Sequence, residues 1–154
     1  MTNREAADAM RHHHAALTAA LHGAASRLDA VAAWTTARDA LVGYVVLEIL
    51  PHAAAEEDTV YPAVAADPLH TSLVEAMRFE HMVLRDLEAA LRTADEPAAA
   101  LRLAGAMDSL FTTHADKENR FLLPVLEAAP EGTLEQLLGA MQERLTPAAS
   151  TRAP

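Results

Sequence analysis

The chain has 154 residues, 51% of them apolar and 22% charged, which suits one globular domain with a sizeable core. Its net charge of −10 argues against a nucleic-acid partner, because phosphate binding needs a basic face. Cysteine is absent, so disulfides and thiolate metal ligands are excluded. The N-terminus has no apolar signal segment and no apolar run reaches membrane length, so we expect a cytoplasmic protein that does not enter a membrane.

Apolar residues recur at steps of three and four, and glycine is scarce, which predicts an all-α fold. Thr2 to Glu5 has the pattern of a capping box and opens a first helix that extends to about residue 28. A turn at residues 29–34 leads into a second helix from about Thr36 to Val60. Pro51 lies inside that helix and should kink it or loosen one turn.

Prolines also mark the later helices. Asp67 and Pro68 offer an N-cap and a first helical residue for a third helix, and Pro97 opens a fourth. Pro124 should distort or end the fourth helix, and a short fifth helix should start with a capping box at Thr133. Short connections between long amphipathic helices predict an antiparallel up-down four-helix bundle with a short C-terminal fifth helix. We expect one domain over residues 1–146 and a flexible tail over residues 147–154.

Each of the four long helices places one histidine in its apolar stripe. Residues three and four apart share one helix face, so these histidines should point into the core. The expected inward positions are Met10, His14, Leu17, Leu21 and Leu28; Val42, Val45, Ile49, His52 and Glu56; Val74, Met77, His81, Leu84, Glu88 and Leu91; and Met107, Phe111, His114, Glu118, Phe121 and Val125.

A His-x-x-x-Glu motif occurs twice, and in both copies a proline follows the glutamate by six residues. The two copies are His52–Glu56–Pro62 and His114–Glu118–Pro124. A spacing of four puts the imidazole and the carboxylate on one helix face. With the single histidines of the first and third helices, the order indicates an internal duplication of a helical hairpin.

Burying four imidazoles and two carboxylates is costly unless they are paired or bind metal. Nitrogen and oxygen ligands suit iron, manganese or zinc. Two carboxylates on opposite helices favour a pair of cations, whereas one zinc ion would leave part of the set unexplained. The Glu-x-x-His motif of ferritin-like centres does not occur in the chain. We therefore predict a metal site formed by His14, His52, Glu56, His81, His114 and Glu118.

This pattern, with its flanking segments EEDTVYP and ENRFLLP, resembles the hemerythrin-like (HHE cation-binding) family over roughly residues 4–128. The resemblance implies a non-heme di-iron centre with an oxo or hydroxo bridge, inside an up-down four-helix bundle. It assigns His14 and His52 to one iron ion and His81 and His114 to the other. It makes Glu56 and Glu118 the bridging carboxylates. Manganese or zinc is less favoured.

The chain departs from the oxygen-carrying hemerythrins at two positions. Those carriers have a fifth histidine where this chain has Met77, and an aspartate where it has Asn119, one residue after Glu118. The resemblance then implies one open coordination position on each iron. Two adjacent open positions suit peroxide or NO better than reversible carriage of O₂.

Several side chains beside the motifs have more than one interpretation. His13 is the less favoured alternative to its neighbour His14 as the helix-one ligand. Glu48, one turn before the first motif, either joins the site or faces water. Tyr61 either donates a hydrogen bond to the site or packs at the bundle end. Glu57 and Glu80 adjoin ligands but are rotated by about 100° from them, so we expect them on the solvated surface.

The first functional hypothesis is a di-iron protein that reacts with peroxide, O₂ or NO, for example with a catalase- or peroxidase-like protective activity. No catalytic acid can be read from the sequence, so the sequence alone does not predict turnover. The alternative is an iron, O₂ or NO sensor or reservoir without turnover. A helical bundle with incidental histidines is the least favoured reading. The sequence does not determine an oligomeric state.

Overall fold

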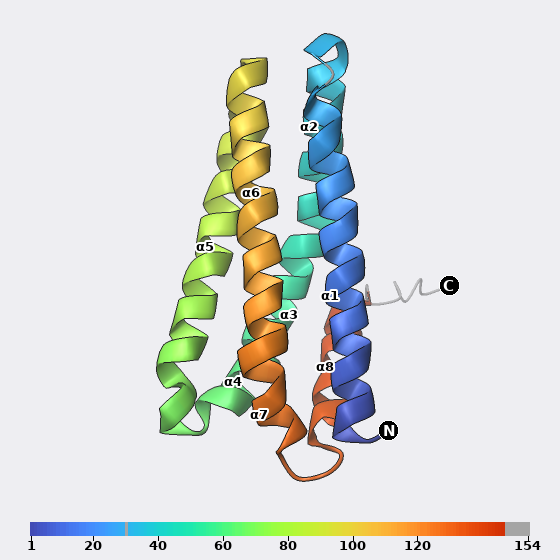
Figure 1. The fold of residues 1–154 in the computed structure, drawn as a ribbon, viewed down its shortest axis with the longest axis vertical. Coiled ribbons are helices and arrows are strands. Elements are labelled where there is room, and N and C mark those ends of the chain that lie inside the picture. Colours follow the sequence, from blue (N-terminus) through green and yellow to red (C-terminus); the bar gives the residue numbers. More distant parts are fainter. Residues whose placement is uncertain (30, 147–154) are drawn as a thin grey trace, which may run out of the picture.

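A computed structural model describes residues 1–29 and 31–146, and the segments it describes are almost entirely helical (Figure 1). The four arms of the bundle are formed by α1 (Asn3–Ser26), by α2 (Trp34–Tyr44) with η3 (Val45–Ile49) and α3 (Leu50–Asp58), by α5 (Thr71–Thr93), and by α6 (Pro97–Lys117) with η5 (Glu118–Leu122). The shorter elements are η1 (Arg27–Asp29), η2 (Val31–Ala33), α4 (Val60–Ala65), η4 (Pro68–His70), α7 (Leu123–Glu127) and α8 (Thr133–Leu145).

The predicted all-α architecture is confirmed. In Figure 1 the four arms run side by side, and α8 lies against the lower part of α1 as the extra C-terminal helix. Helix α1 packs against α2 and α6, and α5 packs against α6 and α2, which closes the bundle. None of the described helices combines the length and the apolar character needed to cross a membrane. The predicted tail, 147–154, lies outside the described residues, and the domain boundary stays a prediction.

Of the two predicted capping boxes, the structure confirms one and corrects the other. Glu5 N–H donates to Thr2 Oγ1 at 3.2 Å and Thr2 N–H donates to Glu5 Oε2 at 2.8 Å, so the first capping box is present. The capping box predicted at Thr133 is wrong. Gly132, with φ of 84°, is the N-cap of α8, and Leu134 N–H donates to the buried Asn3 Oδ1 at 3.1 Å. An asparagine at the other end of the chain therefore supplies this side-chain cap.

Pro51 and Pro124 are each preceded by a π-helical turn. Proline has no N–H, and its ring clashes with the carbonyl four residues earlier. Widening the preceding turn relieves the clash, so Leu50 N–H donates to Val45 O and Leu123 N–H donates to Glu118 O, each five residues back. The predicted distortions at both prolines are confirmed in this form.

The first π turn shifts the inward stripe by one residue. On the N-terminal side of this turn, Leu41 is fully buried in the place predicted for Val42. Val45 and Ile49 face inward as predicted. Glu48 is exposed, which excludes the reading in which it joins the site in this conformation.

The second π turn shifts the stripe of α6 in the same way. Phe121, predicted to face the core, is 57% exposed, and Leu122 is fully buried in its place. Leu126 is likewise buried instead of Val125. The prediction was wrong because an inserted residue changes the register, and the three-and-four pattern does not report it.

The core has two apolar clusters, one on each side of a polar layer. One cluster contains Met10, Tyr61, Met77, Leu122 and Met141 among others, and the second contains Leu17, Leu41, Leu84, Met107 and Phe111 among others. The six predicted site residues belong to neither cluster and lie at the junction between the two along each arm, whereas the buried Glu88 lies between residues of the second cluster. Because apolar side chains flank the polar layer on both sides, water does not reach it along the bundle axis.

Candidate metal centre

The six predicted site residues are all buried, each at most 2% exposed. They come from five elements of the bundle, so the arrangement depends on all four arms. His14 lies on α1, His52 and Glu56 on α3, His81 on α5, His114 on α6 and Glu118 at the start of η5. Their convergence is as predicted, while their role as metal ligands stays a prediction.

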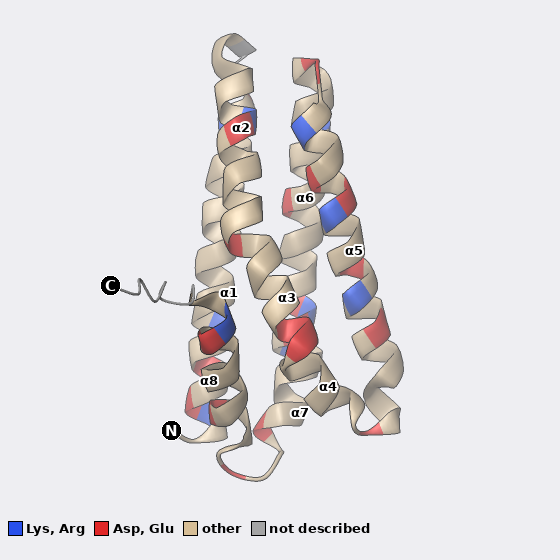
Figure 2. Ribbon diagram, turned by 180° about the vertical axis from the view of Figure 1, so that it is seen from behind, with Lys and Arg blue, Asp and Glu red and all other residues tan. Residues whose placement is uncertain are grey.

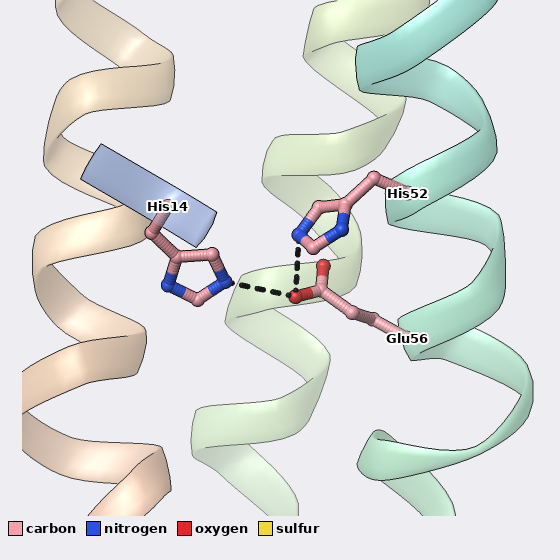
Figure 3. A group of neighbouring side chains, drawn as sticks. All are labelled: His14, His52 and Glu56. Carbon is pink, nitrogen blue, oxygen red and sulfur yellow. Dashed lines mark hydrogen bonds and ion pairs between the residues drawn. The ribbon is translucent and has the colours of Figure 1, made fainter. Parts of the chain in front are cut away.

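Glu56 lies at the middle of the group. Its Oε1 is 2.9 Å from His52 Nε2 and 3.3 Å from His14 Nε2 (Figure 3). Its Oε2 points the other way and is 3.6 Å from His81 Nε2. Two possible cation positions share this carboxylate, and within each the ligand atoms lie within 4.8 Å of one another: His14, His52 and Glu56, and Glu56, His81 and His114.

Burial would raise the pKa of Glu56, but the rings of His52 and His14 outweigh it and lower the pKa well below its ordinary range. Glu56 is therefore ionised and can accept from either side.

Glu118 is placed differently. Its Oε2 is 3.5 Å from both His14 Nε2 and His114 Nε2, and its Oε1 accepts a 2.8 Å hydrogen bond from the fully buried Tyr61 hydroxyl. Burial and the Glu56 carboxylate raise the pKa of Glu118. Of the two readings of Tyr61, the structure supports the one in which it donates a hydrogen bond to the site.

Two glutamates that we expected on the solvated surface contact the site instead. His81 Nδ1–H donates to Glu57 Oε1 at 2.9 Å, and His114 Nδ1–H donates to Glu80 Oε2 at 3.0 Å. That prediction was wrong because it considered only the face of each residue's own helix. A glutamate side chain is long enough to reach a histidine on the neighbouring helix, and no local pattern reports that contact.

Each of these carboxylates also has a basic partner. Arg85 Nη2 donates to Glu57 Oε1 at 2.8 Å, and Lys117 Nζ contacts Glu80 Oε1. Figure 2 shows acidic residues on the lower part of α3 and both basic and acidic residues along the neighbouring α5. Hydrogen bonds with these partners and with the histidines outweigh partial burial and lower the pKa of both Glu57 and Glu80, so both are ionised acceptors.

The other two histidines have weaker partners. His14 Nδ1 lies 2.9 Å from Asn119 Oδ1, an uncharged acceptor. Neither ring nitrogen of His52 has a hydrogen-bond partner among the described residues, although Nε2 is close to Glu56. The ring of His13 lies 4.9 Å from that of His52, but His13 is exposed. The structure thus places His14 rather than His13 in the centre.

The contact between His81 Nε2 and His114 Nε2, at 2.9 Å, tests whether these residues suit a cation. Because Glu57 and Glu80 only accept, Nδ1 of both rings carries the hydrogen. In neutral rings two Nε2 lone pairs would then face each other. The contact needs positive charge, either an extra proton or a shared cation. The separation matches two nitrogen ligands at right angles on one cation with bonds of about 2.1 Å. The residues therefore fit a metal ion.

A comparison with protein families agrees with this geometry. The hemerythrin HHE cation-binding domain matches residues 5–126, most of the chain and all six site residues. The chain belongs to this family. HHE domains bind metal cations, typically iron, and the two His/Glu groups of this HHE domain are where a cation could be held. No curated protein and no solved structure matches the chain.

Without a bound cation, the HHE centre holds protons unevenly. Burial lowers the pKa of His14, but Glu56 and Glu118 outweigh it and raise the pKa to about 9. Burial and the neighbouring His114 lower the pKa of His81 to about 4. A cation would have to displace the proton from His14 in order to bind there.

Two cavities reach the HHE centre from outside. One, of about 510 Å³, lies between α1 and α6 and touches His14 and Asn119. The second, of about 320 Å³, lies between α1, α3 and α8 and touches His13, His52 and Gln142. Both cavities therefore meet the histidine pair on α1 and α3.

Proposed function

We propose that the chain is a non-heme di-iron protein. One iron is held by His14 and His52 and the other by His81 and His114, with Glu56 and Glu118 shared between them. The observation that carries this proposal is the orientation of Glu56, which turns one oxygen toward each histidine pair. A nitrogen and oxygen ligand set without sulfur suits iron, and HHE domains typically bind it.

We further propose that the centre reacts with peroxide, O₂ or NO, in a catalase- or peroxidase-like protective role. A bound iron pair would supply one- and two-electron exchange with such small molecules. The burial of all six ligands supports a small reactant, because a molecule must pass between side chains to reach them.

The chain's own residues have distinct tasks in this proposal. Glu57 and Glu80 keep the hydrogen of His81 and His114 on Nδ1 and leave Nε2 free for the metal. The Tyr61 hydroxyl holds one oxygen of Glu118 and so orients the other toward the histidines. The apolar clusters on both sides limit the access of water.

The first test is metal analysis with an ultraviolet–visible spectrum, on protein expressed in iron-replete medium. We expect two irons per chain and near-ultraviolet absorption from an oxygen-bridged iron pair. Absence of metal, or a single zinc ion, would contradict the di-iron proposal. Glu48→Gln is the matched control, because Glu48 is an exposed carboxylate on the same arm as Glu56.

The second test is reactivity of the iron-loaded protein. We expect O₂ release from added hydrogen peroxide, and loss of that release in Glu56→Gln. Stable binding of NO without consumption of peroxide would contradict the protective activity. It would instead indicate a sensor or reservoir.

A further inference from the structure

The four site histidines differ in what holds their Nδ1 atoms. In the pair on α5 and α6, both Nδ1 atoms donate to ionised carboxylates, at 2.9 and 3.0 Å. In the pair on α1 and α3, His14 has only the amide oxygen of Asn119, at 2.9 Å, and His52 Nδ1 has no partner among the described residues. The two pairs are alike in their ligand atoms and unlike in the groups behind them.

This difference has a direct effect on metal affinity. An acceptor on the far nitrogen fixes the tautomer and the ring orientation and makes the imidazole a better donor, and losing it typically lowers metal affinity by about 10- to 100-fold. Hydrogen bonds to ionised acceptors are also stronger than those to neutral ones. The pair on α5 and α6 has two such acceptors, each backed by a basic side chain.

Open cavities lie against the pair on α1 and α3. The cavity between α1 and α6 touches His14, and the cavity between α1, α3 and α8 touches His52. The far side of the centre instead has Glu57 with Arg85 and Glu80 with Lys117 against the rings.

We infer that the two metal positions are unequal: a divalent cation fills the position of His81 and His114 first and tightly, and the position of His14 and His52 is the weaker, exchangeable one. This inference rests on the proposed function, since it concerns the same pair of positions. It predicts that a protein with one tightly held ion accumulates when metal is limiting.

The test is calorimetric titration of the metal-free protein with Fe²⁺ under argon. We expect two binding steps whose affinities differ at least tenfold. A chelator of intermediate affinity should then remove one equivalent and leave the other. A single step with two equivalents would overturn the inference but not the di-iron proposal. No binding at all would overturn both.

Ligand variants assign the steps. His52→Gln should remove the weaker step and change the affinity of the tighter one by less than threefold, whereas His81→Gln should remove the tighter one. The reverse pattern would overturn the inference. Circular dichroism of each metal-free variant verifies that the bundle is intact.

Variants of the residues that contact the histidine Nδ1 atoms provide a second test if a ligand variant does not fold. Glu80→Gln should weaken the tighter step about 10-fold or more, because the acceptor of His114 loses its charge. Asn119→Asp should strengthen the weaker step by supplying His14 with a charged acceptor. Glu135→Gln, an exposed change on α8, is the matched control. If Glu80→Gln and Asn119→Asp leave both steps unchanged, the inference is wrong.

Discussion

The two halves of the centre have the same sequence motifs but different surroundings. Each half supplies a single histidine and a His-x-x-x-Glu motif, so both halves provide the same candidate ligands. The residue after the motif glutamate is Glu57 in one half and Asn119 in the other, and both contact a histidine of the opposite half. The residue before the single histidine is His13 in one half and Glu80 in the other, and only Glu80 holds a ring nitrogen. Identical motifs therefore have different groups behind their histidines.

The backbones of the two motifs also differ. The first π turn ends before His52, so Glu56 lies in a regular α-helix, whereas the second π turn begins at Glu118 itself. Glu56 turns an oxygen to each side, whereas Glu118 has one oxygen bound by Tyr61 and the other equidistant from two histidines. The two carboxylates that could bridge a metal pair are thus held in different ways.

The largest effect should come from Glu56→Gln. Because Glu56 is the residue common to both His/Glu groups, we expect the metal content to fall from two ions to less than one per chain. Glu118→Gln should lower the metal content less, since Tyr61 already binds one of the oxygens of Glu118. Elemental analysis after dialysis measures both. Retention of two ions in Glu56→Gln would show that the carboxylate is not shared.

Metal removal should destabilise the bundle strongly. At free metal about 100 times the dissociation constant, each ion adds about 2.7 kcal/mol, so two add about 5 kcal/mol, or roughly 10–20 °C in Tm. Thermal unfolding with zero, one and two equivalents of metal should show the larger step for the first equivalent. An unchanged Tm after complete removal would contradict metal binding to the folded state.

The pH dependence of the metal-free protein should expose the His14 side of the centre. Despite burial, Glu56 and Glu118 raise the pKa of His14 to about 9 in the folded protein. The pKa of an unfolded histidine is about 6.5. The proton stabilises the fold fully below pH 6.5, and this contribution, on the order of 3 kcal/mol, is lost as pH rises through 9.

Urea unfolding between pH 6.5 and 9 measures this loss. His14→Gln should flatten the pH dependence, and His13→Gln should leave it unchanged in this range, because partial desolvation of its ring and its histidine neighbours lower the pKa of His13. Equal slopes in the native protein and His14→Gln would contradict the assignment.

The smallest effect should come from Tyr61→Phe. It leaves Glu118 Oε1 without its buried donor, which should lower the free energy of unfolding of the metal-free protein by about 2 kcal/mol. Tyr44→Phe is the control, because Tyr44 donates to an uncharged acceptor, Leu17 O, and should cost about 1 kcal/mol. Equal losses in the two variants would indicate that Glu118 does not depend on Tyr61.

Local sequence patterns predicted much of this fold. The period of the apolar residues predicted the helices, and the stripe Val74, Met77, His81, Leu84, Glu88 and Leu91 is buried as expected. The same period placed the four histidines and two glutamates inward, because a helix face depends only on spacing within one helix. Proline positions predicted where the helices distort.

The tertiary structure decided what depends on residues far apart in the chain. The form of the distortion at Pro51 and Pro124, a π turn, moved Phe121 out and Leu122 in. Glu57 and Glu80 reach histidines on other helices, and Asn3 caps a helix at the far end of the sequence. The sequence by itself determined that the four histidines and two glutamates of the site face the interior. Only the packing of the arms decided which group contacts the Nδ1 atom of each histidine. Such contacts are made between helices, so the residue pattern within a single helix does not predict them.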